Sequence, residues 1–198
     1  MVTYIITIVL VLVWCYLLWV THRAKLQFWH FLIGSMGLFI ILMMLVQPVM
    51  TEPLARAVAA LAGLFGDLTD TFVPYFKYGI LFVESAQGAI TLQIDFECSG
   101  IIEIMAFISL LVFYRVYSIS ERIVVGVAGI LYIMIANALR IIVICEMIHY
   151  LGTDVYYMAH TIVGRIVFYA FSIVLYFYVF TKPQIIRMKI GKFNYGDH

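Results

Sequence analysis

Charged residues are scarce in this chain of 198 residues, because Asp, Glu, Lys and Arg together make up only 12% of it. Soluble domains carry about 25% charged and about 45–50% apolar residues. Here 65% of the residues are hydrophobic, and the mean hydropathy is +1.07. Such a chain has too few polar side chains to cover a water-soluble fold, and it is too apolar to be disordered. The composition therefore predicts an integral membrane protein.

Several functional signals are also missing. The formal net charge is only +1, so we expect no nucleic-acid partner. The chain has no phosphate-binding glycine loop and no HExxH zinc pair, and we expect no cofactor and no metal in its site. Cys15, Cys98 and Cys145 are too few for a disulfide framework, although a single Cys98–Cys145 pair stays open. No A-x-A-like cleavage site follows the first apolar run, which predicts a retained span and not a signal peptide.

Five apolar runs are long enough to be transmembrane helices, which need about 20 mostly apolar residues. The runs are Val2–Val20, Phe28–Val49, Gly100–Val116, Ile123–Ile148 and Tyr157–Phe180. No internal repeat separates them, so they predict one multi-pass domain over residues 1–198. The expected fold is an all-α integral membrane protein with about five transmembrane helices, an interfacial helix and a small extracytoplasmic β-hairpin.

The basic residues are concentrated in three segments. These are residues 21–27, the turn around Tyr117–Arg122, and a tail at residues 181–198. The segment Thr51–Glu97 instead carries six acidic and only two basic residues. Because Lys and Arg accumulate on the cytoplasmic side, the pattern predicts a plasma-membrane protein with its N-terminus outside and its C-terminus inside.

The long acidic segment is predicted to have structure of its own. Pro53–Phe65 is rich in Ala and Leu but too short to span, which favours an interfacial or re-entrant helix. Polar and apolar residues alternate strictly along Thr91–Phe96, which is typical of a strand with one apolar face. With Ile80–Val83 and a turn around Ser85–Gly88, this run predicts an outer β-hairpin that leads directly to Cys98.

Four ionisable residues lie inside the predicted spans: Glu103, Arg140, Glu146 and Arg165. A charge at the centre of a membrane helix costs about 2.5–3.5 kcal/mol by insertion scales, so each of them needs a reason to be there. At a helical rise of about 1.5 Å per residue, all four fall in the outer half of the membrane. This layer of charge is where we expect the function to reside.

Cys98 and His160 lie just above this layer, each at the outer end of a span. Arg140 can extend its side chain towards both of them, so residues from three helices are predicted to converge. A cysteine at a helix N-terminus near cations is expected to have a lowered pKa. A nearby histidine can accept and return its proton, and a guanidinium can stabilise an oxyanion. These are the parts of a cysteine peptidase.

The same residues have structural interpretations, which the sequence leaves open. Arg140 and Arg165 would pair with Glu103 in a non-catalytic helical subunit of an envelope assembly or a transporter. Glu146 and His149 have the i, i+3 spacing of di-iron bundles, but no second pair is present. A single metal ion is a further alternative, with ligands drawn from Cys98, Cys145, Glu146, His149 and His160.

Three motifs resemble the signature blocks of the exosortase/archaeosortase family. They are Cys98-Ser99-Gly100, Asn137-Ala138-Leu139-Arg140 and the later His160, in the same order and on three consecutive predicted spans. The resemblance covers about Ile80 to Arg165. It implies a multi-pass membrane cysteine transpeptidase whose partner is a membrane-anchored substrate protein. The substrate signal is C-terminal and consists of a short motif, a transmembrane helix and a basic cluster.

The resemblance also implies a role for each residue of the motifs. Cys98 would be the nucleophile that forms a thioester, His160 the general base and acid, and Arg140 the group that stabilises the oxyanion or clamps the substrate carbonyl. Asn137 would orient Arg140 from one helical turn away. Ser99 would start the helix, and Gly100 would allow close approach. The chain is shorter than the larger family members and is similar to the compact Gram-positive type called exosortase G.

Overall fold

The computed structural model describes residues 2–186 of the chain, and of residues 2–8 only the backbone. The predicted tail at residues 181–198 therefore lies largely outside the described residues. The helices are α1 (Val2–Arg23), α2 (Gln27–Leu45), α3 (Gln47–Thr69), α4 (Ile101–Phe113), α5 (Ile119–Leu151), α6 (Tyr156–Met158) and α7 (Gly164–Tyr176). Helical structure continues without a break across Thr153–Ile186, and it includes two π-helical turns, η3 (Ala159–Val163) and η4 (Phe177–Thr181). The chain is thus a mostly helical membrane protein, as its composition predicts.

Four of the described helical segments are long and apolar enough to cross a membrane. They are Gln27–Leu45, Gln47–Thr69, Ile119–Leu151 and Thr153–Ile186. α1 is apolar over the part whose side chains are described, Val9–Arg23, and α4 (Ile101–Phe113) is a shorter apolar helix. The third predicted span thus contains only the 13 helical residues of α4, roughly 20 Å, which is less than the hydrocarbon thickness of about 30 Å.

The second predicted span ends earlier than expected, and the predicted interfacial helix is longer. The chain breaks helical regularity at Val46, and α3 begins at once with Pro48 in its first turn, where a missing N–H costs nothing. α3 then runs for 23 residues through Pro53, so it far exceeds the predicted Pro53–Phe65. The predicted helix was too short because its first residues, 47–49, were assigned to the preceding apolar span and the helix was begun only at the Ala-rich run.

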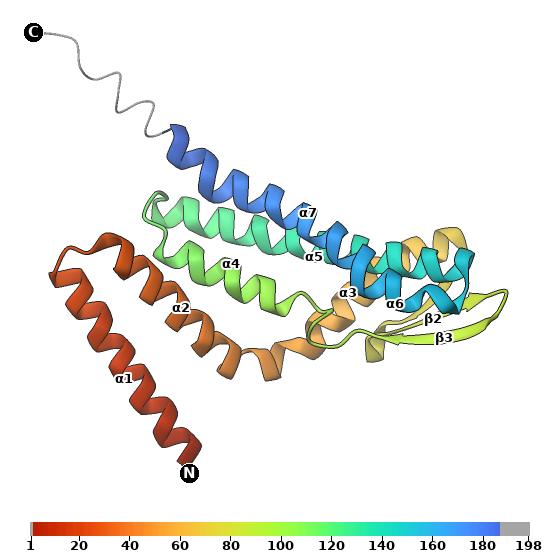
Figure 1. Ribbon diagram of the computed structural model, residues 1–198, viewed down its shortest axis with the longest axis horizontal. Helices are drawn as coiled ribbons and strands as arrows, with labels where there is room; N and C mark the ends of the chain where they lie inside the picture. The colour runs from red at the N-terminus through yellow and green to blue at the C-terminus, as the bar shows by residue number, and fades with distance from the viewer. Residues whose placement is uncertain (1, 187–198) are drawn as a thin grey trace, which may run out of the picture.

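α4, α5 and α7 run roughly along the long axis of the molecule, and α1 and α2 are inclined to it (Figure 1). α2 packs on α4, and α5 packs on both α4 and α7, while α1 contacts α2. The α1–α2 and α4–α5 connections, which carry Arg23, Lys25, Arg115 and Arg122, share one end of the molecule, and the sheet lies at the other (Figure 1). This separation is the one that the positive-inside rule requires, and the absolute orientation stays a prediction.

A three-stranded antiparallel sheet follows α3, in the order β1 (Phe72–Tyr75), β2 (Ile80–Ser85), β3 (Gly88–Gln93). The predicted hairpin corresponds to β2 and β3, which are joined at the Ser85–Gly88 pair. β3 ends at Gln93, before the predicted Phe96, because the chain turns towards Cys98 after Ile94. The edge strand β1 was not predicted, since Pro74 within four residues argues against a strand.

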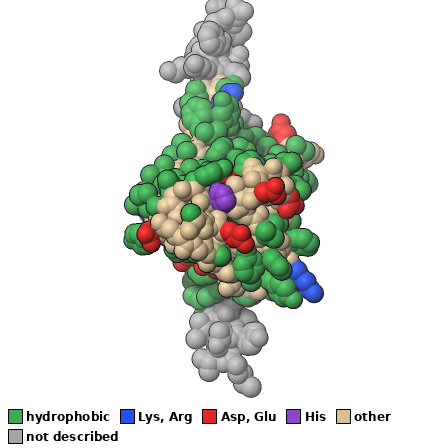
Figure 2. Space-filling view, turned by 90° about the vertical axis from the view of Figure 1, so that its right-hand side faces the viewer, with side chains coloured by type: hydrophobic (Ala, Val, Ile, Leu, Met, Phe, Trp, Pro, Cys, Tyr) green, Lys and Arg blue, Asp and Glu red, His purple; other side chains and the backbone are tan. Residues whose placement is uncertain are grey.

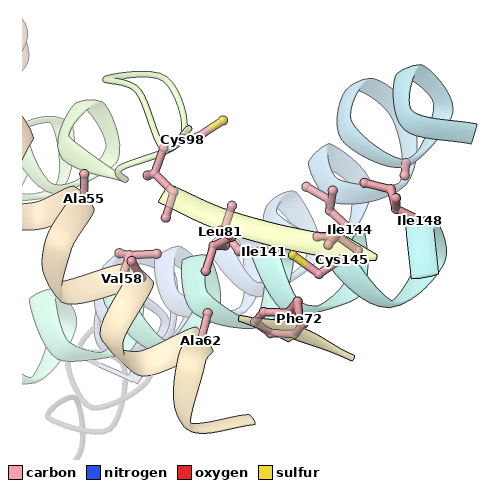
Figure 3. Close-up of a cluster of buried hydrophobic side chains, with 14 residues drawn as sticks. Ala55, Val58, Ala62, Phe72, Leu81, Cys98, Ile141, Ile144, Cys145 and Ile148 are labelled. Carbon is pink, nitrogen blue, oxygen red and sulfur yellow. The ribbon is translucent and has the colours of Figure 1, made fainter. Parts of the chain in front are cut away.

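The sheet is held by an apolar cluster between α3 and α5 (Figure 3). Small side chains on α3, Ala55, Ala59 and Ala62, are buried and let the helix approach the sheet closely. Figure 3 shows the sulfur of Cys145 among these apolar side chains and the sulfur of Cys98 pointing away from them. Both are free thiols, so the alternative Cys98–Cys145 disulfide is not formed. The cluster thereby fixes the end of the sheet from which the Cys98 loop departs.

Candidate active site

The loop from Ile94 to Gly100 presents Cys98 at the beginning of α4. The backbone N–H of Cys98 donates to both the carbonyl oxygen of Asp95 (3.2 Å) and its carboxylate Oδ1 (3.0 Å). The Ser99 hydroxyl donates to the carbonyl of Phe96 at 3.1 Å, which tightens the same turn. It also accepts a long contact of 3.4 Å from the N–H of Ile101, the first residue of α4. Ser99 therefore lies in the turn that leads into α4, two residues before the helix begins.

Gly100 and Asn137 hold this loop against α5. Gly100 has φ +79°, a left-handed conformation that favours glycine, and a Cβ at this position would lie 3.4 Å from Asn137 Nδ2. The amide of the fully buried Asn137 donates to the carbonyl oxygen of Cys98. Asn137 makes no hydrogen bond to Arg140 within the described part of the chain, so its contact is with the nucleophile loop and not with the expected partner.

His160 lies directly against Cys98. Its Nε2 is 3.0 Å from the Cys98 Sγ, a hydrogen-bonding distance between residues 62 positions apart. His160 belongs to the π-helical turn η3, an irregularity that is frequent at functional sites because it shifts the side chains out of regular register. The imidazole stacks on Tyr156, with ring centroids 5.6 Å apart and an interplanar angle of 27°. The turn and the stacking together fix the ring beside the thiol.

Arg140 approaches the same sulfur from α5. Its Nη2 lies 3.8 Å from Cys98 Sγ, and its Cζ is 5.9 Å from the centroid of the Phe168 ring. The residue is only 5% exposed. A positive charge is thus held next to the thiol, where negative charge develops when the sulfur attacks a carbonyl.

The ionisation of Cys98 differs from the expectation. Burial, together with the neighbouring Asp95 and Glu97 carboxylates, raises the pKa of the Cys98 thiol to about 11. The charge of Arg140 lowers the pKa but does not offset the burial. The expected lowering was wrong because the sulfur lies in a site from which solvent is excluded, which disfavours the thiolate. The resting side chain is a neutral thiol, so its proton has to leave during the reaction.

Within the part of the chain that the structure describes, Glu103, Arg165 and Glu146 do not form the ion pairs that a purely structural role would require. Among residues 2–186, Glu103 forms no ion pair within 4 Å with either Arg140 or Arg165. Glu103 and Arg165 instead line a cavity of about 280 Å³ next to Arg140. Glu146 accepts a hydrogen bond from Thr71 at 2.6 Å and takes no part in the Cys98 site.

The described residues do not form the metal site that was weighed as an alternative. His149 Nδ1 contacts the carbonyl oxygen of Glu84 at 2.6 Å, at the sheet and away from Cys98. Within residues 2–186, no three His, Cys, Asp or Glu side chains are clustered in a way that would hold a metal ion.

Asp95 is a site residue that the sequence reasoning missed. It is exposed, and its carboxylate bonds the backbone of Cys98 and raises the pKa of the thiol. Its position three residues before the cysteine was the available signal, since Asp commonly accepts from a backbone N–H in a tight turn. Acidic side chains and a histidine are visible on the end of the molecule at which the sheet lies (Figure 2).

One comparison with known proteins identifies a relationship. The family described as transmembrane exosortase (Exosortase_EpsH) matches residues 1–178 of the chain. No curated protein and no solved structure matches it. The match extends well beyond the three motifs, to α1 and α2 at one end and to all of α7 and the first two residues of η4 at the other.

Proposed function

The chain belongs to the transmembrane exosortase family, and we propose that it is a cysteine endopeptidase or transpeptidase acting through a thioester at Cys98. Membership implies a membrane protease role in protein sorting. The proposed substrate is a membrane-anchored exported protein with a C-terminal sorting signal. The observation that carries the proposal is the 3.0 Å contact between Cys98 Sγ and His160 Nε2, with the Arg140 guanidinium on the same sulfur.

The reaction begins with attack of Cys98 on the scissile carbonyl. As the carbon–sulfur bond forms, the thiol proton moves to His160 Nε2, which the 3.0 Å distance allows without rearrangement. The carbonyl oxygen becomes an oxyanion, and the Arg140 guanidinium is the nearby positive charge that stabilises it. His160 then returns the proton to the leaving amine as the carbon–nitrogen bond breaks. The remaining thioester is resolved by water in hydrolysis or by an amine in transpeptidation.

Two hydrogen bonds keep the nucleophile in position for this attack. Asp95 accepts from the N–H of Cys98 and Asn137 donates to its carbonyl, so both backbone groups of the cysteine are bound. Since its N–H already has two acceptors, Cys98 itself supplies no free backbone donor to an oxyanion. The positive charge of Arg140 therefore has the larger part in stabilising the transition state.

The non-catalytic alternative rests on structural ion pairs, and it finds less support. It requires Glu103 to neutralise Arg140 or Arg165, and neither pair exists within 4 Å among residues 2–186. A buried arginine that contacts a thiol, and that forms no ion pair with a carboxylate among the described residues, is the arrangement that catalysis needs. The compact exosortase G type and the outward-facing site stay predictions.

The test is processing of a co-expressed exported protein that ends in a transmembrane helix and a basic cluster. Cys98→Ala and His160→Gln should leave it uncleaved, whereas Cys145→Ala, which removes the other buried thiol, should leave cleavage intact. Neutral hydroxylamine should release the amino-terminal product from the wild-type enzyme, because it cleaves thioesters. Normal processing by Cys98→Ala would exclude the proposal.

A further inference from the structure

A small polar cavity adjoins the catalytic residues on the side of α4 and α7. It has a volume of about 280 Å³, with Phe96, Ile102, Phe168 and Tyr169 as its apolar and aromatic lining. Its polar lining consists of Glu97, Glu103, Arg140 and Arg165. Glu97 directly precedes Cys98, and Arg140 contacts the Cys98 sulfur, so the cavity lies next to the site of attack.

Two residues of the lining, Glu103 and Arg140, each carry a buried polar atom that has no partner among the described residues. Neither Glu103 Oε2 nor Arg140 Nε makes a hydrogen bond to any group in the described part of the chain, residues 2–186. Arg140 is about 95% buried, as its exposure of 5% shows. Leaving a buried donor or acceptor unsatisfied costs roughly 1–3 kcal/mol, and more for a charged group. Such atoms at a reaction site are suited to bind substrate.

The two atoms specify which polar groups a ligand in the cavity has to offer. Glu103 Oε2 is an acceptor and Arg140 Nε is a donor, so a ligand has to offer one N–H and one carbonyl oxygen. The lining carries two acidic and two basic side chains, and this balance favours an uncharged group over an ion. The volume suits part of a peptide better than a large ligand, since drug-sized sites measure about 300–1,000 Å³. An amide meets all three requirements.

We propose that this cavity binds an amide group of the substrate peptide adjacent to the scissile bond. Glu103 accepts the amide N–H and Arg140 Nε donates to the amide oxygen. The inference rests on the proposed peptidase function. Arg140 then has two separate tasks, because Nη2 is directed at the reacting sulfur while Nε binds the neighbouring amide. Glu103 becomes a specificity-determining residue that requires an N–H on the substrate.

The test uses peptide probes on the full-length protein in detergent. Acetyl-trialanyl chloromethyl ketone alkylates a cysteine, forming a thioether and releasing chloride as the thiol loses its proton. Three further probes each carry an N-methyl group on a different amide. In the wild-type protein, one of the three should label Cys98 about tenfold more slowly, because a hydrogen bond to a charged acceptor is lost.

The variants then assign this effect to one side chain. Glu103→Leu should remove the difference between the sensitive probe and its parent, and Glu103→Gln, which preserves shape and one acceptor, should reduce it to about threefold. Glu146→Gln makes the same change in a carboxylate that bonds Thr71 outside the cavity, and it should keep the wild-type pattern. Thermal melting of each variant establishes that it is folded, and Glu103→Gln carries the test if Glu103→Leu does not fold.

The outcomes separate the two proposals. If every probe labels wild type and Glu103→Gln with unchanged ratios, the amide site is wrong and the peptidase function stands. If iodoacetamide labels Cys98 but no peptide probe labels it any faster than 2-chloroacetamide does, the peptide-binding function itself fails, and the amide site with it. Loss of the N-methyl effect in Glu146→Gln would equally contradict the role assigned to Glu103.

Discussion

Neighbouring charges of both signs act on the Cys98 thiol, and removing Arg140 or Asp95 should change its reactivity in opposite directions. Arg140→Gln should slow alkylation of Cys98, because the guanidinium lowers the pKa of the thiol. Asp95→Asn should accelerate it, because the carboxylate raises that pKa through its charge and a hydrogen bond. Asn retains an oxygen that can accept from the Cys98 N–H, so the loop geometry is preserved in this variant.

The size of the effects follows from the distances. With a pKa of about 11, only about one thiol in a thousand is ionised at pH 8. A unit charge about 4 Å away contributes about 4 kcal/mol at an effective dielectric constant of 20, and Arg140 Nη2 lies 3.8 Å from the sulfur. Since each 1.36 kcal/mol is a factor of ten in ionisation, Arg140→Gln should slow alkylation at least tenfold. Asp95 is exposed and screened by solvent, so Asp95→Asn should accelerate it about threefold.

The assay is the rate of iodoacetamide labelling at Cys98 between pH 6 and pH 10, read by peptide mass spectrometry to distinguish the three cysteines. Wild-type labelling should still be rising at the upper end of this range, because the thiolate continues to accumulate there. Lys77→Gln serves as the control, since it removes a basic charge at the sheet end of the molecule without contacting Cys98. A plateau below pH 8 in the wild-type protein, or equal rates for wild type and Arg140→Gln, would refute the electrostatic reasoning.

Three further predictions concern the loop and its surroundings. Gly100→Ala should lower the melting temperature by about 2–8 °C, because the left-handed conformation costs about 1–2 kcal/mol with a Cβ, whereas Gly126→Ala in regular helix should not lower it. Asn137→Leu should reduce substrate processing at least tenfold while the protein stays folded, since the Cys98 carbonyl loses its donor, and unchanged processing would show that this hydrogen bond is dispensable. Mild oxidation should not link Cys98 to Cys145, whose sulfur lies in the apolar cluster, and a mass loss of about 2 Da with both thiols blocked would contradict this arrangement.

Local patterns in the sequence were sufficient to predict those parts of the fold that depend on them. The α5 span and the β2–β3 hairpin follow from apolar length and from strict alternation, which are properties of consecutive residues. The junction at Val46 was missed because the apolar run continues past it and only Pro48 signals a new helix start. β1 was missed because its pairing with β2 overrides the weak strand preference of a Pro-containing segment.

The proximity of Cys98 and His160 could be predicted in outline, because both residues fall at the outer end of a span. Their contact distance could not be, because it depends on the π-helical turn at Ala159–Val163 and on the turn that binds the Cys98 N–H. The sequence could not predict that Glu103 and Arg140 form no ion pair. It gives the charge and the depth of each residue, and these are the same whether or not the two side chains are in contact. The pKa of Cys98 depends on burial by segments distant in sequence, so the local argument from the helix terminus gave the wrong sign.

A neutral thiol suits a nucleophile that has to stay unreactive until its substrate binds. Thiolates react with oxidants far faster than thiols do, and the predicted outward-facing site would expose Cys98 to an oxidising environment. With a pKa of about 11 the sulfur is protected at rest, at the cost of a smaller reactive fraction. No free thiolate has to form beforehand, because His160 Nε2 lies 3.0 Å from the sulfur and accepts the proton as attack proceeds. The charge of Arg140 is then most effective in the transition state, when the proton has left and a carbonyl oxygen shares the negative charge.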